Sequence, residues 1–290
     1  MRVVVLLAAT GCGFNIPAAG GVPSTTDASD SPGSQPADAP GPWSTPTPIV
    51  LDVLGVDDPS LTADRLELYF NANSDIYVTK RAATTAAWGP SSIVTQASGP
   101  SSETTPEISR DGLTLTFASD RAGTQGGTDI WITTRPNRSA TWGTAIVVPE
   151  LSTPLAEAGA VMTPDGRRIV FTSYRKANIS PDIYLSERPS GTGVWGPMME
   201  VTALNTDLHE GSAFLTDDAL VLCFDTDRTG NLDLYCSERS STSDVFPAPQ
   251  PLADIDTTFS EEDPWLSPDG RQIVFYSNRG GFSGLWEASR

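Results

Sequence analysis

The sequence predicts an all-β fold: a five-bladed β-propeller of four-stranded antiparallel blades over residues 43–290, closed by an N-terminal strand. Three observations predict it. A unit of roughly fifty residues recurs five times, which is the signature of a repeat architecture. Each unit consists of short strands rich in Ile, Val, Phe, Thr and Tyr, separated by turn residues. Residues 43–290 show no sustained 3.6-residue apolar period, so helices should be nearly absent.

Each unit opens with a tight turn between two strands. Pro-Asp-Gly suits such a turn because Pro presets φ and Gly accepts a positive φ. Units one and four depart from this pattern, with Asp64-Arg65 and Asp218-Ala219 in place of Asp-Gly. The turns lie at 61–64, 108–112, 162–166, 215–218 and 266–270. The strands that follow them are expected at 66–70, 113–117, 169–171, 220–224 and 273–275. The next strands are expected at 75–77, 129–131, 182–184, 233–235 and 284–286.

A third recurring element is an aromatic residue followed by a turn and a strand. It begins at Trp88, Trp142, Trp195 and Phe246. At the spacing of the repeat, the next copy would fall at about position 297, which is beyond residue 290. A further copy lies before the first unit, at Trp43, and leads into 49–51. We therefore expect 49–51 to supply the outer strand of the last blade, because closing the ring removes an exposed strand edge.

Two of these units match a known family closely. Ser-Pro-Asp-Gly-Arg-Gln-Ile-Val-Phe at 267–275 and Thr-Pro-Asp-Gly-Arg-Arg-Ile-Val-Phe at 163–171 resemble the WD40-like propeller repeat of the TolB type. The Asp-Ile-Tyr of the following strand matches that repeat too. The resemblance covers about residues 43–290 and is specific for the fold. It implies a periplasmic or surface binding module, or an accessory domain of a peptidase, and we expect no peptidase domain in this sequence.

The N-terminus is typical of an export signal. A short apolar run at 3–9 precedes Ala-Thr-Gly-Cys, which resembles a bacterial lipobox whose acylated residue would be Cys12. The alternative is a plain secretory signal with an incidental cysteine. Residues 13–42 hold 6 Pro and 5 Gly and no Lys or Arg, so we expect a flexible linker between the signal peptide at 1–12 and the propeller.

Composition excludes several functions. The net charge of −18 leaves no basic surface for nucleic acid, so we expect no nucleic-acid binding. The chain has one histidine, His209, which argues against a zinc site and against a Ser-His-Asp triad. We therefore predict no catalytic residues, no metal and no cofactor, with His209 an ordinary loop residue.

Four units place a glutamate 18 positions before an arginine, centred on the turn. A hairpin folded at the turn brings the two side chains nearly opposite each other. The favoured interpretation is a structural ion pair in each blade, and the alternative is a charged ring that binds a ligand. The pairs are Glu103/Arg121, Glu157/Arg175, Glu210/Arg228 and Glu261/Arg279.

Two further features concern the fourth unit. Cys223 and Cys236 fall on adjacent antiparallel strands at facing positions, so we predict a disulfide between them in an oxidising compartment. The alternative is two small buried apolar residues. The stretch 225–233 also resembles a calcium loop, but its twelfth position is Cys236 rather than an acid, so we favour an ordinary turn.

Together these features predict an exported lipoprotein, facing the periplasm or the cell surface and held to the membrane by its lipid alone. We expect a monomer whose propeller binds an envelope protein or peptide without catalysis, because propeller loops offer a broad contact surface. The alternative function is a glycan-active enzyme of the glycoside hydrolase kind, which requires two free carboxylates near the axis of the ring.

Overall fold

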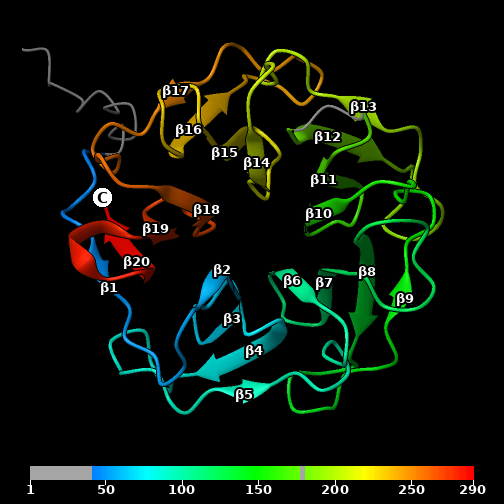
Figure 1. Ribbon diagram of the computed structural model, residues 1–290, viewed down its shortest axis with the longest axis horizontal. Coiled ribbons are helices and arrows are strands. Elements are labelled where there is room, and N and C mark those ends of the chain that lie inside the picture. The colour runs from blue at the N-terminus through cyan, green and yellow to red at the C-terminus, as the bar shows by residue number, and fades with distance from the viewer. Residues whose placement is uncertain (1–40, 177–179) are drawn as a thin grey trace, which may run out of the picture. The chain divides into compact units, whose positions relative to one another are not determined.

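Five four-stranded antiparallel sheets surround one axis in the computed structural model, which describes residues 41–176 and 180–290 (Figure 1). The only helix in the described part of the chain is one 3₁₀ turn, η1 (Arg279–Gly281). No helix in these residues is long and apolar enough to cross a membrane. The prediction of an all-β five-bladed propeller is confirmed. The expected signal peptide at 1–12, with Cys12, lies outside the described residues, as does the expected linker up to residue 40.

In blades 1 to 4 the strands run from the axis outward in chain order, and in blade 5 the outermost strand is the N-terminal β1. Blade 1 holds β2 (Asp57–Leu61), β3 (Glu67–Ala72), β4 (Asp75–Lys80) and β5 (Ser92–Ile93). Blade 2 holds β6 (Glu103–Ile108), β7 (Thr114–Ser119), β8 (Asp129–Thr134) and β9 (Ile146–Val147). Blade 3 holds β10 (Glu157–Met162), β11 (Arg168–Ser173), β12 (Asp182–Glu187) and β13 (Met199–Glu200). Blade 4 holds β14 (Glu210–Leu215), β15 (Val221–Thr226), β16 (Asp233–Glu238) and β17 (Gln250–Pro251). Blade 5 holds β18 (Glu261–Leu266), β19 (Gln272–Ser277), β20 (Gly284–Ser289) and β1 (Thr47–Pro48).

The ring is closed by the N-terminal strand, as predicted, but two residues earlier than expected. β1 pairs with β20, with Thr47 opposite Glu287 and Pro48 opposite Trp286. The sequence analysis placed this strand at 49–51, and the structure corrects its position to Thr47–Pro48. Ile49 donates one more backbone hydrogen bond, to Leu285, and then buries its side chain in the core instead of continuing along the edge.

A hydroxyl–carboxylate pair shapes the turn between the two inner strands of every blade. The Ser or Thr hydroxyl donates to the Asp two residues later over 2.5–2.7 Å, and that Asp accepts the backbone N–H two residues further on. Arg65 and Ala219 take the positive φ that Gly has in the other three blades. The Ser/Thr-x-Asp pattern therefore specifies the turn even where Pro and Gly are missing.

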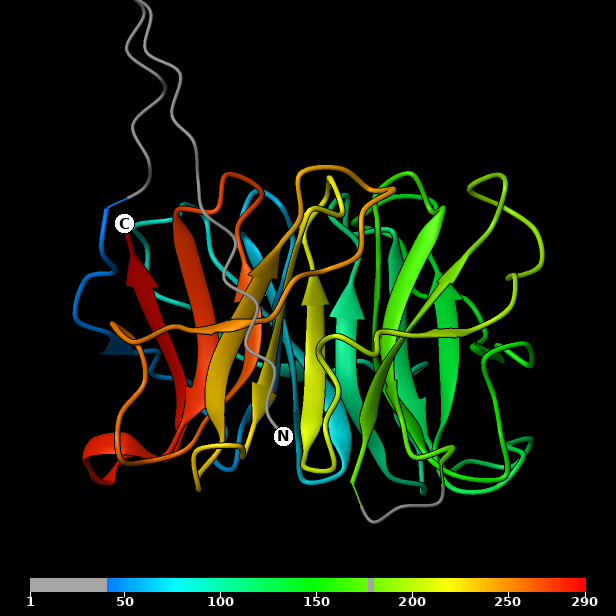
Figure 2. The ribbon, with the colours of Figure 1, turned by 90° about the horizontal axis from the view of Figure 1, so that it is seen from above.

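The two ends of the ring carry different connections between the strands (Figure 2). We call the end that carries the Ser/Thr-x-Asp turns the turn face; the C-terminus lies there, at the upper edge of Figure 2. The opposite end, where every innermost strand begins, is the loop face. Side chains that start an innermost strand therefore meet around the axis at the loop face.

Candidate functional site

Every innermost strand carries a β-bulge at the same place, close to the loop face. A residue near the start of each strand has a left-handed backbone, and the pairing register shifts there. Four of the five are not glycine, which is uncommon, and bulges are frequent beside functional sites. These residues, called here the bulge ring, are Asp58 (φ 50°), Thr105 (47°), Gly159 (57°), Ser212 (45°) and Asp263 (55°).

The bulge ring is continuous around the axis. The backbone N–H of Thr105 donates to Asp58 over 3.3 Å, and that of Gly159 donates to the Thr105 hydroxyl over 3.0 Å. A Cβ on Gly159 would lie 3.8 Å from the Cα of Ser212. The carboxyl of Asp263 is hydrogen-bonded to Ser212 on one side and to Asp58 on the other. The five blades thus meet at one layer of polar groups.

One side of the bulge ring is strongly acidic. Asp57 and Glu262, which precede ring members, and Asp225 of β15 lie beside Asp58 and Asp263; these five are called here the axial acids. All but Asp225 keep partial exposure. In the described ranges 41–176 and 180–290, no Lys or Arg forms an ion pair with an axial acid.

Burial and crowding raise the pKa of the axial acids Asp57, Asp58, Glu262 and Asp263. Burial, the Asp263 charge and the Glu262 charge raise the pKa of Asp57 to about 9. Burial and the charges of Asp263 and Asp57 raise the pKa of Asp58 well above its ordinary range. Burial and the charges of Asp263 and Asp225 raise the pKa of Glu262 to about 7. The group therefore holds a mixture of protonated and ionised carboxyls near neutral pH.

His209 lies in the loop before β14, as expected, and its side chain also contacts an axial acid. Its Nε2 lies 2.9 Å from Asp225 Oδ1, and its backbone N–H donates to Asp227 over 3.0 Å. Burial opposes protonation of the imidazole, but the charges of Asp225, Asp227 and Glu262 outweigh it and raise the pKa of His209. The single histidine of the chain thus adds the only basic side chain that contacts an axial acid among the described residues.

The other side of the bulge ring carries small residues instead of acids. Blade 3 contributes Ala158 and Gly159 where blades 1 and 5 carry acids. A Cβ on Gly159 would lie 3.9 Å from the hydroxyl oxygen of Thr172, the residue opposite Ala158 on β11. Thr172 is 5% exposed and its hydroxyl has no hydrogen-bond partner in the structure. A buried hydroxyl without a partner, next to a missing side chain, is a place where a polar ligand atom would be stabilised.

Exposed apolar side chains lie on the loop face in the blades that carry the axial acids. They lie in the segments that lead into the innermost strands of blades 1, 4 and 5, and beside η1. All are more than a third exposed. Groups of exposed large apolar side chains are uncommon on soluble proteins. This apolar rim consists of Leu54 (87% exposed), Leu208 (44%), Phe259 (45%) and Phe282 (36%).

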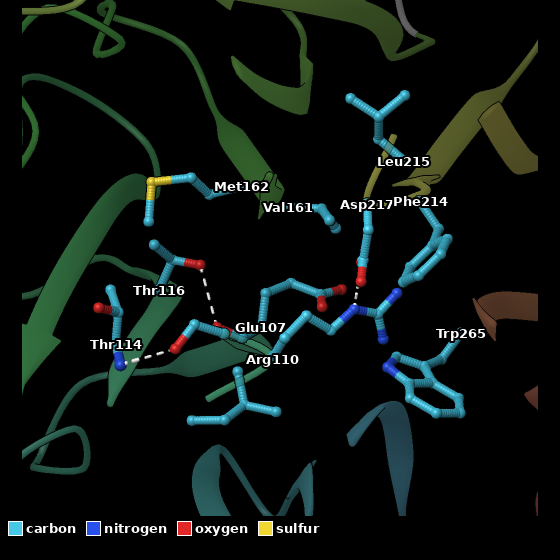
Figure 3. A pocket seen from close by; sticks show the side chains of 12 residues that line it. Glu107, Arg110, Thr114, Thr116, Val161, Met162, Phe214, Leu215, Asp217 and Trp265 are labelled. Atoms are coloured by element: carbon cyan, nitrogen blue, oxygen red, sulfur yellow. Dashed lines mark hydrogen bonds and ion pairs between the residues drawn. The ribbon is translucent and has the colours of Figure 1, made fainter. Parts of the chain in front are cut away.

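The turn-face end of the axis is filled by side chains (Figure 3). Arg110 reaches across the ring, where its Nε donates to Asp217 over 2.5 Å and its Nη2 donates to the Leu266 carbonyl over 3.1 Å. Its guanidinium also lies 5.2 Å and 5.3 Å from the ring centroids of Phe214 and Trp265. Only a cavity of about 20 Å³ remains beneath it, room for one water molecule. A ligand therefore reaches the axial acids from the loop face.

The four expected Glu–Arg pairs are present and lie at the loop-face ends of blades 2 to 5. Each Glu is fully buried and also accepts a backbone N–H and a Ser or Thr hydroxyl. These carboxylates have no free oxygen to offer a substrate. The Arg Nη2 to Glu Oε1 distances are 3.0 Å for Arg121–Glu103, 3.6 Å for Arg175–Glu157, 3.0 Å for Arg228–Glu210 and 3.0 Å for Arg279–Glu261.

The arginines of these pairs are occupied as well, which disagrees with the alternative in which they belong to a charged ring that binds a ligand. Arg121 donates from Nη2 to the Ala97 carbonyl over 2.6 Å, and its guanidinium lies over the rings of Phe117 and Trp131. Arg228 donates from Nη2 to the Leu204 carbonyl over 3.0 Å. Their side chains are only 20% and 19% exposed. Arg175 and Arg279 donate in the same way to the carbonyls of Leu151 and Ile255. The arginines thus tie each blade to the segment before it.

The remaining predicted features are the two cysteines and the calcium-like stretch of blade 4. Cys223 and Cys236 face each other on β15 and β16 and are joined by a disulfide. The calcium-like stretch does not converge: the Asp225 carboxyl is bonded to His209, while Asp233 accepts a hydrogen bond from Thr229. Asp233 groups instead with Asp256 and Glu261, whose oxygens lie within 4.8 Å of one another, but Glu261 is neutralised by Arg279.

The axial acids were missed by the sequence analysis, although a signal was present. Asp57-Asp58-Pro59 in blade 1 and Glu262-Asp263-Pro264 in blade 5 occupy the same positions of the innermost strand. Two acids before a Pro, in two blades that the ring closure makes neighbours, would have identified one side of the axis.

Comparisons with known proteins support the fold. No protein-family model and no curated protein sequence matches the chain. Among solved structures, TolB from Acinetobacter baumannii is similar, with a TM-score of 0.52 and 18% identity over 81% of this chain and 54% of that one. The chain thus spans about half the length of that protein. The TolB-like resemblance is confirmed as a likeness of fold.

Two glycoside hydrolase propellers are also similar. An endo-arabinase from Bacteroides thetaiotaomicron matches with a TM-score of 0.60 and 13% identity over 82% of this chain and 94% of that one. A thermostable family-43 glycoside hydrolase matches with a TM-score of 0.60 and 13% identity over 83% and 90% of the two chains. At such identities these likenesses show the propeller fold alone.

Proposed function

We propose that this protein is a non-catalytic, exported lipoprotein whose loop face binds a positively charged segment of an envelope protein or peptide. The observation that carries the proposal is the group of axial acids, which lacks a Lys or Arg partner in the described part of the chain and lies in the same blades as the apolar rim. Complementary charge guides the approach of a partner, and exposed apolar side chains supply contact area. The closed turn face leaves the loop face as the polar, accessible end of the axis.

Recovery of partners from detergent-solubilised envelopes tests this proposal. The wild-type chain should retain a partner that elutes as salt concentration rises, because exposed charge pairs are screened. The double variant Asp58→Asn/Asp263→Asn should lose it. Asn accepts the positive φ of both positions, so the bulge should persist. The matched control is Asp207→Asn, which removes one exposed charge from the same face. A partner retained equally by the double variant would contradict the proposal.

Membrane tethering is a separate part of the proposal. It rests on the lipobox-like Ala-Thr-Gly-Cys and the linker composition after it. Cys12→Ser should move the protein from the membrane fraction to the soluble fraction without changing its melting temperature, since Cys12 precedes the propeller. Mass spectrometry of the mature N-terminus decides the matter: an unmodified N-terminus in the wild type would overturn lipidation.

Glycoside hydrolysis is the second candidate, and the mixed protonation of the axial acids favours it. Such enzymes need one protonated carboxylic acid and one ionised carboxylate side by side. Glu262, whose pKa burial and neighbouring charges raise to about 7, would supply the protonated acid of such a pair. Reducing-sugar release from a panel of polysaccharides that includes arabinan tests it. Release by the wild type that Glu262→Gln abolishes would establish hydrolysis and displace the binding proposal.

A further inference from the structure

The two sides of the bulge ring are chemically unlike. Going around the axis, Asp58 and Asp263 are neighbours, and Gly159 is the member farthest from both in ring order. Carboxyl groups therefore crowd one side. On the opposite side Gly159 has no side chain, and the partnerless hydroxyl oxygen of Thr172 would lie 3.9 Å from a Cβ at that position. A ligand group on the axis would have several acceptors on one side and a hydroxyl on the other.

The acidic side lacks a counter-charge that the protein provides elsewhere. Glu103, Glu157, Glu210 and Glu261 are fully buried, and each has its own Arg. Buried Glu67 contacts Arg135, Arg138 and Lys80. Asp57 and Asp58 instead contact another carboxyl, that of Asp263, so they need a proton or an added cation to stay together. A bound ligand could supply that cation.

The arrangement fits a basic side chain better than a metal ion. Among the described residues, the one group of three acids whose oxygens lie within 4.8 Å of one another is Asp233, Asp256 and Glu261, outside the bulge ring. The axial acids are distributed along one arc of the ring and do not converge in that way. A guanidinium, with five N–H donors fixed in a plane, can reach several separate acceptors at once.

We infer that the axial acids are the recognition site for one arginine side chain of the partner, inserted along the axis from the loop face, with Asp58 and Asp263 its principal acceptors and with Gly159 and Thr172 on the side opposite them. This inference rests on the proposed binding function and specifies the chemistry that the loop face selects. The neighbouring apolar rim, defined above by Leu54, Leu208, Phe259 and Phe282, would cover the residues that flank the arginine.

Calorimetric titration of the full chain with acetyl-arginine amide tests the inference directly. The neutral isostere acetyl-citrulline amide is the matched ligand control. We expect saturable binding of the arginine probe and binding of the citrulline probe weaker by at least about tenfold, because only a cation compensates the carboxylates. Asp58→Asn/Asp263→Asn should weaken arginine binding by about tenfold or more, and Asp207→Asn by less than about twofold. Melting curves of each variant verify that it is folded.

The outcomes are distinct. Equal binding of both probes, no saturable binding of arginine, or full retention by the folded double variant would each overturn the inference. Binding of a short arabino-oligosaccharide that displaces the arginine probe would assign the axis to a glycan instead. A recovered protein partner whose binding ignores Asp58 and Asp263 refutes both proposals for this face. Arginine binding without any recovered partner supports the site and counts against the proposed function alone.

Discussion

Arg290 lies over the indole ring of Trp43, with 4.3 Å between its Cζ and the ring centroid, and its Nε donates to the Gly270 carbonyl over 2.8 Å. Every blade repeats this arrangement at 4.0–4.4 Å, in the pairs Arg81/Trp88, Arg135/Trp142, Arg188/Trp195 and Arg239/Phe246. In blade 5 alone the two partners come from opposite ends of the propeller sequence. The pair therefore contributes to ring closure as well as to the blade.

Removing this pair should weaken the whole ring. We expect Trp43→Ala to lower the free energy of unfolding by about 3–5 kcal/mol, because a buried Trp is lost. Arg290→Ala should lower it by about 1–2 kcal/mol. Urea unfolding measures both. Arg81→Ala is the control for the same contact inside a continuous blade, and an unchanged urea midpoint for Trp43→Ala would contradict the closing role.

The closing strand should matter more than the segment before it. Deleting 41–50 removes Trp43, β1 and the buried Ile49, so β20 would be left with an open edge. Deleting 13–39 instead should leave the melting temperature within about 2 °C of the wild type, because its composition offers no core. Thermal melts followed by circular dichroism compare the two. Equal melting temperatures would show that β1 does not close the ring.

The Glu–Arg pairs should be costly to break because their carboxylates are buried. Arg279→Ala leaves Glu261 without its cation and should lower the free energy of unfolding by about 3–5 kcal/mol. Glu187→Gln, which disrupts the exposed Arg168–Glu187 pair, should lower it by less than about 1 kcal/mol. Urea titration separates the two cases. A loss at Arg279 no larger than that at Glu187 would refute the structural role.

The disulfide should add stability to blade 4. It joins residues 13 positions apart, a short loop, so its removal by Cys223→Ala/Cys236→Ala should lower the free energy of unfolding by at most about 3 kcal/mol. A thiol count on denatured, unreduced mature protein checks that the bond forms in the native compartment. Two reactive thiols at these positions would contradict the bond and weaken the case for export.

Stability should fall as pH rises from about 5 to 9. Burial raises the pKa of Asp57 to about 9 and that of Glu107 to about 8, so the folded chain keeps protons that the unfolded chain has released. The raised pKa of His209 acts in the same direction, because the stability it contributes is lost as pH rises through that pKa. Carboxyls with lowered pKa, such as Asp165, titrate below this window.

Melting temperatures at about pH 5.5 and pH 8.5 measure the effect, and the lower pH should give the higher value. Glu107→Gln should reduce the difference, since Gln can still accept the hydrogen bond that Ser60 donates over 2.8 Å but carries no titrating proton. Asp207→Asn, on the exposed loop, should leave the difference unchanged. A melting temperature that rises with pH would show that the axial carboxyls are not held protonated.

The fold could be predicted from sequence because its elements are local and repeated. The Ser/Thr-x-Asp turns, the aromatic positions and the Glu–Arg spacing each lie within one unit, and their agreement across the units fixes strand order and ring closure. The predicted position of the closing strand, 49–51, was wrong by two residues. The repeat pattern does not predict that Ile49 leaves the strand and buries its side chain in the core. The same comparison of shared positions did not identify the axial acids, because they are not shared by all five units.

The candidate site depends on differences between the units. The bulge at Asp58, Thr105 and their counterparts cannot be read from alternation of apolar residues, since it inserts an extra residue into the strand. Proximity of Asp57 and Asp263 comes from closing blade 5 against blade 1. Residues that are 206 positions apart become neighbours only in the complete ring.

The pairing of Thr47 with Glu287 has a consequence for biogenesis. A ribosome makes β1 first among the propeller strands and β20 last, so β1 must wait for nearly the whole domain before it finds its partner. Until then blade 5 is incomplete, and the Asp58–Asp263 contact does not exist. An export route that carries the chain unfolded would let all blades form together on the far side of the membrane. A stalled or truncated chain would expose an unsatisfied edge that proteases and chaperones can recognise.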